Sequence, residues 1–218
     1  LFLAIALPAE LILGLLLAFL FLERMPGRQV FVALLVLPVV ISPIIAGAMW
    51  RLLFDNRFGP INQIVSWLTG EPTTILWIVS PQFVYPAILM AEIWQWTPFM
   101  FLLLLAALSN VDKSQLEAAE IDGAGFAVTF RTIILPAIRP VLVIAVLIRA
   151  LDLFRLFDIV WALTKGGPGT MTETVSIYAY VQGFQQFETS YAAAMAFAIL
   201  IIVNVLVLLA LRRVEIAR

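Results

Sequence analysis

Five long apolar segments dominate this chain and restrict the folds that it can adopt. They cover residues 1–22, 29–53, 83–108, 136–163 and 191–211. A helix of about 20 apolar residues crosses the ~30 Å hydrocarbon core of a bilayer. Hydrophobic residues make up 63% and charged residues 12% of the 218-residue chain, against roughly half and a quarter in soluble domains. The sequence therefore predicts an all-α, polytopic membrane helix bundle, with residues 1–218 as a single transmembrane domain.

Two features modify this simple pattern of spans. Pro38 and Pro43 interrupt the second apolar segment, and membrane helices tolerate such breaks where neighbouring helices satisfy the freed backbone groups. Residues 54–82 are of mixed polarity and contain Trp67 and Trp77. Because tryptophan is enriched at membrane interfaces, we expect short helices here that lie along the membrane surface.

Ionisable residues occur inside several of the apolar segments, where a central charge costs about 2.5–3.5 kcal/mol on insertion scales. One lies in the third segment, and four recur at every third position of the fourth. Such residues mark functional sites, and together with tryptophans that can stack on a sugar ring they predict a water-filled substrate path. The predicted path residues are Glu92, Trp94, Trp96, Arg149, Asp152, Arg155 and Asp158.

A purely structural alternative exists for the four charges of the fourth segment. Residues three apart on a helix are neighbours, so the alternating signs could neutralise one another within that helix. Glu10, in the first apolar segment, is a further candidate, to which we give less weight because it lies near the start of the chain.

The polar stretch between the third and fourth segments predicts two short helices joined by a turn. Ser114 and Glu117 have the spacing of a capping box, so we expect the first helix to begin there. Gly123 can end it by adopting a positive φ. A second helical run over 126–134 is expected to end at Pro136, because proline disfavours helical backbone in the residue before it.

This stretch resembles the "EAA" loop of ABC-importer permease subunits. The resemblance rests on Glu117-Ala118-Ala119, Asp122-Gly123-Ala124, Phe130, Ile133 and Leu135-Pro136. In that family the loop, at about 110–136 here, is cytoplasmic, and its first helix rests in a groove on the ATPase subunit. The resemblance implies that the ATPase-coupling residues are Glu117, Ala118, Ala119, Asp122, Gly123 and Ala124.

A second stretch is similar to carbohydrate-type ABC permeases of the maltose and glycerol-phosphate class. In those proteins an Asp … Leu-Thr-x-Gly-Gly-Pro run precedes the last helix, and here it corresponds to Asp158 and residues 163–168. The implied function is a permease subunit of a bacterial ABC importer, forming half of the path for a sugar, polyol or sugar-phosphate. A permease for a non-carbohydrate solute is the runner-up, and a non-transport membrane scaffold is a more distant alternative.

The resemblance also implies the partners. They are a second homologous permease, two ATPase subunits and an extracytoplasmic solute-binding protein. We expect ATP and magnesium to be bound by the ATPase, because this chain lacks a G-x-x-x-x-G-K-[ST] run. The chain has no His and no Cys, so we expect no metal, no cofactor and no catalytic residue in it, and an intramembrane enzyme would have to rely on carboxylates. A net charge of −1 gives no electrostatic basis for binding nucleic acid.

Basic residues predict the orientation. With the 110–136 loop in the cytoplasm, the inner segments hold Arg24, Arg28, Lys113, Arg131, Arg139, Arg212, Arg213 and Arg218, and the outer ones hold Arg51, Arg57 and Lys165. This bias agrees with the positive-inside rule. We therefore expect a multi-pass protein of the bacterial inner membrane with the loop and the C-terminus in the cytoplasm. Leu1 would then lie outside, so we expect one more helix upstream and six in the full subunit.

Overall fold

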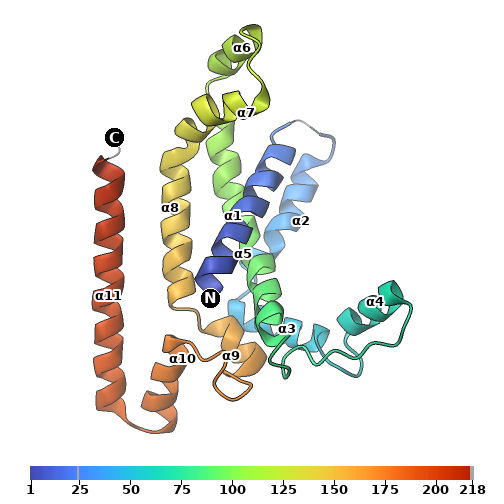
Figure 1. Cartoon of the computed structure of the whole chain (residues 1–218), viewed down its shortest axis with the longest axis vertical. Coiled ribbons are helices and arrows are strands. Elements are labelled where there is room, and N and C mark those ends of the chain that lie inside the picture. The colour runs from blue at the N-terminus through green and yellow to red at the C-terminus, as the bar shows by residue number, and fades with distance from the viewer. Residues whose placement is uncertain (24, 217–218) are drawn as a thin grey trace.

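In the computed structural model every regular element of the described residues is a helix (Figure 1). The structure describes the backbone of residues 1–23 and 25–216 and the side chains of 1–23 and 25–208. The predicted inner positions Arg24, Arg212, Arg213 and Arg218 therefore lie outside the described side chains. The elements are α1 (Phe2–Leu20), α2 (Arg28–Val40), α3 (Pro43–Leu53), α4 (Pro60–Thr69), α5 (Val84–Ser109), α6 (Lys113–Ile121), α7 (Phe126–Thr129), η1 (Phe130–Ile134), α8 (Leu135–Phe154), α9 (Asp158–Thr164), α10 (Val175–Tyr180), η2 (Val181–Gln185) and α11 (Thr189–Ile216).

The predicted membrane bundle is confirmed. Four stretches are long and apolar enough to cross a bilayer, and the bent pair α2–α3 makes a fifth if it is taken as one span. The four are α1, α5, the continuous run of α7, η1 and α8, and residues 189–208 of α11. Figure 1 shows α6 beyond one end of these spans, together with the α1–α2 turn and the end of α11, while α3, α4, α9 and α10 lie at the other end.

Small residues bring α1 against α5. Ala6, Glu10, Gly14 and Ala18 recur every fourth residue on α1 and are all buried. A Cβ at Gly14 would lie 2.6 Å from the Cβ of Met100 on α5, so the two helices approach too closely for a larger residue. Small residues at such contacts are typical of membrane helix packing.

The second predicted span is broken rather than straight. Helices α2 and α3 meet at an angle of 98°, and Pro43 begins α3. The buried side chain of Gln95, on α5, donates a hydrogen bond of 2.9 Å to the carbonyl of Ile41 at the break. The expectation that a neighbouring helix satisfies the freed backbone is therefore confirmed.

The prediction that Pro136 ends a helix is wrong. Leu135 has helical backbone angles, φ −60° and ψ −44°, and its N–H bonds to the carbonyl of Phe130, five residues back, in the wide turn η1. Pro136 then lies in the first turn of α8, where a missing N–H costs little. The helical span runs over residues 126–154 and not over 136–163, because the chain leaves the helix after Phe154.

The two tryptophans of the 54–82 segment differ in how they pack against the rest of the protein. Trp67, on α4, has an exposed fraction of 82%, in keeping with a place at a membrane surface. Trp77 instead donates its indole N–H to Asn62, 2.9 Å away, and packs against Phe54 at a ring distance of 5.4 Å. Trp77 is half-buried and is part of the protein packing, so its role as an interfacial anchor stays a prediction.

Candidate functional site

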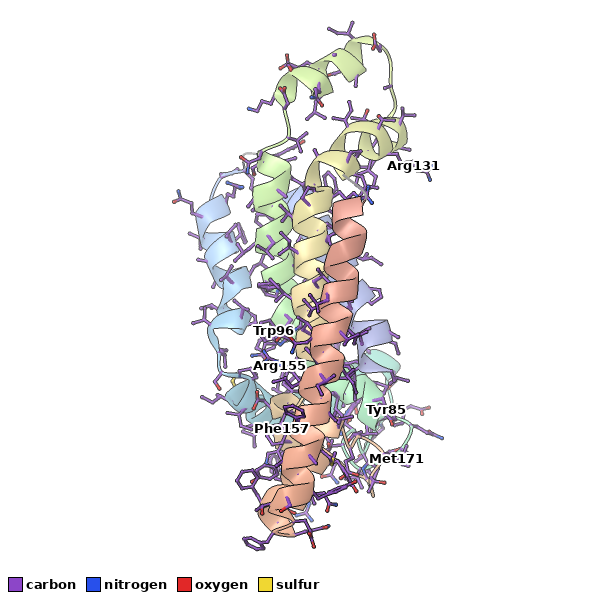
Figure 2. The ribbon with its side chains drawn as sticks, turned by 90° about the vertical axis from the view of Figure 1, so that its left-hand side faces the viewer. Tyr85, Trp96, Arg131, Arg155, Phe157 and Met171 are labelled. Carbon is purple, nitrogen blue, oxygen red and sulfur yellow. The ribbon has the colours of Figure 1, made fainter. Side chains whose placement is uncertain are left out.

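A cavity of about 460 Å³, called the polar cavity below, opens where α5, α8, α9 and the start of α3 meet. Its lining includes six of the seven predicted path residues, Glu92, Trp96, Arg149, Asp152, Arg155 and Asp158, together with Pro43, Leu156, Phe157 and Ile159. Figure 2 shows Trp96, Arg155 and Phe157 in succession from mid-height toward the end opposite α6.

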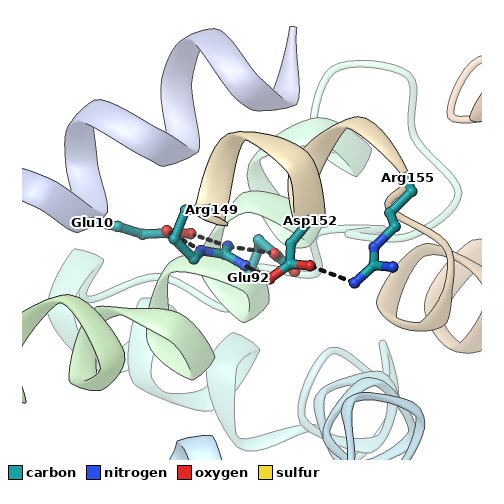
Figure 3. Close-up of polar contacts among 5 residues, drawn as sticks. All are labelled: Glu10, Glu92, Arg149, Asp152 and Arg155. Atoms are coloured by element: carbon teal, nitrogen blue, oxygen red, sulfur yellow. Dashed lines mark hydrogen bonds and ion pairs between the residues drawn. The ribbon is translucent and has the colours of Figure 1, made fainter. Parts of the chain in front are cut away.

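At the inner wall of the polar cavity, Arg149 joins two carboxylates from two other helices (Figure 3). Its Nε and Nη2 each donate to one oxygen of Glu10 at 2.8 Å, and Nη2 also donates to Glu92 at 2.8 Å. All three side chains are at most 1% exposed. We call Glu10, Glu92 and Arg149 the triad, and it connects α1, α5 and α8.

The triad has more carboxyl groups than guanidinium groups, and its hydrogen bonding is incomplete. Two carboxylates face one guanidinium, and the second oxygen of Glu92 is buried without a hydrogen-bond partner in the described residues. The ring of Trp96 lies 4.5 Å from the guanidinium carbon of Arg149, a distance typical of cation–π contacts.

The four charges of the fourth segment do not form one continuous ladder. The Nη2 of Arg155 bonds to Asp152 at 2.8 Å, so this pair is neutralised locally, as the structural alternative predicts. Arg149 instead has its short contacts on other helices, and its distance to Asp152 is 3.9 Å. Asp158 begins a separate helix, α9.

Side chains from later in the chain hold the break between α8 and α9. Thr174 donates its hydroxyl to the carbonyl of Leu156 at 2.7 Å, and Ser176 donates to that of Arg155 at 3.0 Å. Carbonyls at a helix end have no partner within the helix. These two bonds therefore help to set where Asp158 enters the wall of the polar cavity.

Trp94 was expected in the path and does not line the polar cavity. Its ring packs against Trp50, with centroids 5.7 Å apart, and it borders a separate apolar cavity between α1, α2 and α5. Each residue of a helix is turned by about 100° from the one before it. Trp94 is two residues from both Glu92 and Trp96, so its side chain points to nearly the opposite side of α5.

Glu10 received too little weight as a candidate site residue in the sequence-based prediction. It occupies the same face of α1 as Ala6, Gly14 and Ala18. Small residues in that register predict a helix–helix contact, so the register places Glu10 inside the bundle. A buried carboxylate there requires a basic partner, and Arg149 supplies it.

The second candidate site is α6 with the turn that follows it. The helix is capped two residues earlier than predicted, because its N-cap is Asp112 rather than Ser114. The hydroxyl and the N–H of Ser114 both donate to the Asp112 carboxylate, at 2.8 and 2.9 Å. These hydrogen bonds lower the pKa of the Asp112 carboxyl. The predicted capping box is therefore wrong, and the Glu117 side chain is left exposed.

The predicted glycine turn is confirmed. Gly123 has φ +73°, its N–H bonds to the carbonyl of Glu120 at 3.0 Å, and the N–H of Ala124 bonds to that of Ala119 at 2.9 Å. This pair of bonds is a Schellman motif, which needs a left-handed residue after the helix. The turn directs the chain from α6 into α7.

Most of the surface of α6 is exposed in this chain, although Leu116 packs against the bundle. None of its residues is buried, and Ile121 is 87% exposed at its end. On α7, Phe126 is 69% exposed although its ring touches that of Phe19. An exposed apolar residue among charged ones, at the tip of the molecule, fits a surface that is covered by another protein.

Comparisons with known proteins identify relatives along nearly the whole chain. Residues 3–216 match the family model described as "Binding-protein-dependent transport system inner membrane component". The trehalose/maltose transport system permease protein MalF of Thermococcus litoralis is 40% identical over 171 residues, covering 78% of this chain and 57% of that protein. The sulfoquinovosyl glycerol transport system permease protein SmoG of Agrobacterium fabrum is 33% identical over 74% of this chain and 52% of that protein. This chain thus spans little more than half the length of these curated relatives.

Solved structures share the fold. A crystal structure of a bacterial ABC transporter involved in the import of the acidic polysaccharide alginate matches with a TM-score of 0.83, over 96% of this chain and 72% of that chain, at 23% identity. The bacterial alginate ABC transporter in complex with an alginate pentasaccharide-bound periplasmic protein matches with a TM-score of 0.81, over 95% and 71% of the two chains, at 24% identity.

Proposed function

Because this chain belongs to the family of binding-protein-dependent transport system inner membrane components, we propose that it is a permease subunit of a bacterial ABC importer. In this role it forms half of the translocation path for a carbohydrate and couples that path to ATP hydrolysis by a separate ATPase subunit. The named relatives for trehalose and maltose and for sulfoquinovosyl glycerol support a carbohydrate solute.

The observation that carries the proposal is the polar cavity inside a bundle of membrane spans. Charged residues in membrane segments face bundle interiors or water-filled spaces because exposure to lipid is costly. Here the carboxylates and guanidinium groups converge with Trp96 and Phe157 on one cavity. Hydroxyl groups of a sugar can hydrogen-bond the former, and its apolar ring face can stack on the latter.

The exposed α6 and its turn are proposed as the joint to the ATPase. Glu117, Ala118 and Ala119 lie on α6, with Gly123 and Ala124 in the turn. Alanines let another surface approach closely, and the exposed Glu117 carboxylate offers a charge to a basic partner. A movement of the ATPases would then be transmitted through α7 and η1 into the span that carries Arg149.

The partners and the orientation follow from the same proposal. A second homologous permease would complete the path, two ATPase subunits would bind ATP and magnesium, and a solute-binding protein would deliver the solute at the end opposite α6. The solved alginate transporter with its periplasmic protein supports the last partner. We place α6 and the C-terminal end of α11 in the cytoplasm, as the basic residues predict.

One observation supports a transport path over a scaffold. A scaffold would leave every core charge paired locally or turned toward lipid. Asp158 instead lines the polar cavity without an ion pair to any described residue, which favours a site that meets a solute.

The test is uptake by the assembled transporter in vesicles. Asp152→Asn and Arg155→Gln should each reduce uptake of the transported solute strongly while ATP hydrolysis and assembly stay measurable. Both side chains border the polar cavity, so their loss should affect the solute. Neither is fully buried, with Arg155 72% and Asp152 27% exposed, so their loss should affect the stability of the bundle less. Glu188→Gln, a change of an exposed residue outside the cavity, is the control and should transport normally.

Two results would count against the proposal. Normal uptake in both cavity variants at normal expression would remove these residues from the path. Loss of assembly in both would indicate that they serve the fold alone.

A further inference from the structure

The charge of the transported solute is left open by the family, since the named relatives and neighbours act on both neutral and acidic carbohydrates. The lining of the polar cavity carries information on this point. Three carboxylates, from Glu92, Asp152 and Asp158, face two guanidinium groups, from Arg149 and Arg155. Glu10 adds a fourth carboxylate directly behind the wall. Even with one of these carboxyl groups protonated, the cluster holds no excess positive charge.

Arg149 offers little of its charge to an anionic ligand, because most of its guanidinium is already bonded. Its Nε and Nη2 are used by Glu10 and Glu92, all at 2.8 Å. Its Nη1 lies 3.9 Å from Asp152. The face of the guanidinium lies against Trp96, and the side chain is only 1% exposed. An anion that approached Nη1, the one nitrogen without a hydrogen bond to a described residue, would also approach the Asp152 carboxylate.

Arg155 is accessible but already carries a counter-charge. Its Nη2 is bonded to Asp152 at 2.8 Å, and the side chain is 72% exposed. A carboxylate, sulfonate or phosphate that approached Arg155 would also approach the Asp152 carboxylate. Charges of one sign brought together in a site cost several kcal/mol, which offsets the attraction of a single exposed arginine.

The unoccupied hydrogen-bonding groups of the wall include carboxylate acceptors as well as the remaining N–H groups of the two arginines. Asp158 is exposed and has no hydrogen bond through its carboxylate to a described residue. The buried Oε2 of Glu92 also lacks a partner within the described chain. Carboxylate oxygens accept hydrogen bonds and do not donate them when ionised. Hydroxyl groups both donate and accept hydrogen bonds, so a polyol or a sugar satisfies such a wall without adding charge.

We propose that the polar cavity takes an uncharged, hydroxyl-rich solute and disfavours solutes that carry carboxylate, sulfonate or phosphate groups. This inference rests on the proposed function, in which the polar cavity is part of the path. It narrows that function, since a sugar-phosphate and an acidic sugar become poor substrates and a neutral saccharide becomes the fitting one.

The test uses the assembled transporter in lipid nanodiscs and follows tryptophan fluorescence during titration. The probes are neutral disaccharides and their matched anionic forms: maltose with maltobionate, and trehalose with trehalose 6-phosphate. Trp96→Phe identifies the part of the signal that arises in the polar cavity. We expect saturable, Trp96-dependent quenching by a neutral disaccharide, at least about tenfold tighter than by its anionic form.

A charge substitution sharpens the result. Asp158→Lys places a cation at the exposed edge of the cavity and should reduce the preference for the neutral form by about tenfold. Glu188→Lys makes the same change of charge away from the cavity and should leave the preference unchanged.

The contrary outcomes separate the two proposals. An anionic disaccharide that binds as tightly as its neutral form, or more tightly, overturns the inference and leaves the proposed function standing. Absence of any Trp96-dependent signal with either charge form would contradict the proposed function itself, because the cavity would then not bind saccharides.

Discussion

At the scale of single residues, the stability of the bundle depends on the contacts of Arg149. Arg149 is buried against Glu10 and Glu92, whose carboxylates lie 2.8 Å from its Nη2 and offset its charge. Breaking such a group by removing one partner is expensive because a charge is left buried and unpaired. Arg149→Met leaves two buried carboxylates without their cation. We expect it to lower the stability of the purified complex by about 3–5 kcal/mol, measured by thermal unfolding.

Two further variants control this prediction. Arg155→Gln removes an arginine whose side chain is 72% exposed, and an exposed pair is worth only about 0–1 kcal/mol. The triple variant Glu10→Leu, Glu92→Leu, Arg149→Met replaces the whole triad by apolar groups, which is often close to neutral. Stability should therefore return in the triple variant. An Arg149→Met protein as stable as the Arg155→Gln protein would show that the triad does not stabilise the bundle.

Most of the residues that line the polar cavity could be predicted from the sequence, but their partners could not. An ionisable residue in an apolar segment is visible without a structure, and six of seven predicted path residues do line one cavity. The error at Trp94 has a simple geometric cause, since its neighbours Glu92 and Trp96 point in other directions around α5. The partners of Arg149 were not predicted, because they lie 57 and 139 residues away in the chain.

At the scale of elements, the turn after α6 depends on one backbone angle. Gly123 has φ +73°, and a Cβ added there would meet nothing within 4 Å. The obstacle to another residue is therefore backbone strain alone, about 1–2 kcal/mol and more for a β-branched side chain. Gly123→Val should leave membrane insertion intact, shift the direction of the chain after α6, and weaken attachment of the ATPase and uptake.

Gly125 is the matched control for this prediction. It is also open to a Cβ but has an ordinary extended backbone, φ −70° and ψ 160°, at the start of α7. Gly125→Val should therefore retain the ATPase. The measurement is the amount of ATPase that co-purifies with each variant, paired with uptake in vesicles. Retention of the ATPase and normal transport by Gly123→Val would contradict a coupling role for this turn.

The boundaries of elements were predicted less well than their existence. The turn at Gly123 follows from local chemistry, which the sequence displays. The end of α8 depends on Thr174 and Ser176, which bond to the chain at the break from about 20 residues away. The helix continues through Pro136 because of the wide turn η1. The tendency of the residue before a proline to avoid helical backbone does not predict such a turn. The end of α8 thus involves tertiary contacts, whereas the passage through Pro136 involves a hydrogen bond within the same helical run.

At the scale of the whole molecule, the two proposed sites lie far apart along the spans. Helix α5 leads from the end near α3 to the end near α6 (Figure 1). Its 26 residues correspond to about 39 Å at 1.5 Å per residue, which exceeds the ~30 Å hydrocarbon core. Residues beyond its two ends must therefore face opposite sides of the membrane.

This separation gives a test of orientation that uses the absence of cysteine from the sequence. Lys113 and Asn56 are both exposed and lie beyond opposite ends of α5. Lys113→Cys should react with an impermeant thiol reagent only in inside-out vesicles stripped of ATPase, since the basic residues place α6 in the cytoplasm. Asn56→Cys should react only in intact spheroplasts. Reaction of position 113 from outside would reverse the proposed orientation and with it the ATPase joint. Reaction of both positions from one side would contradict the arrangement of the spans.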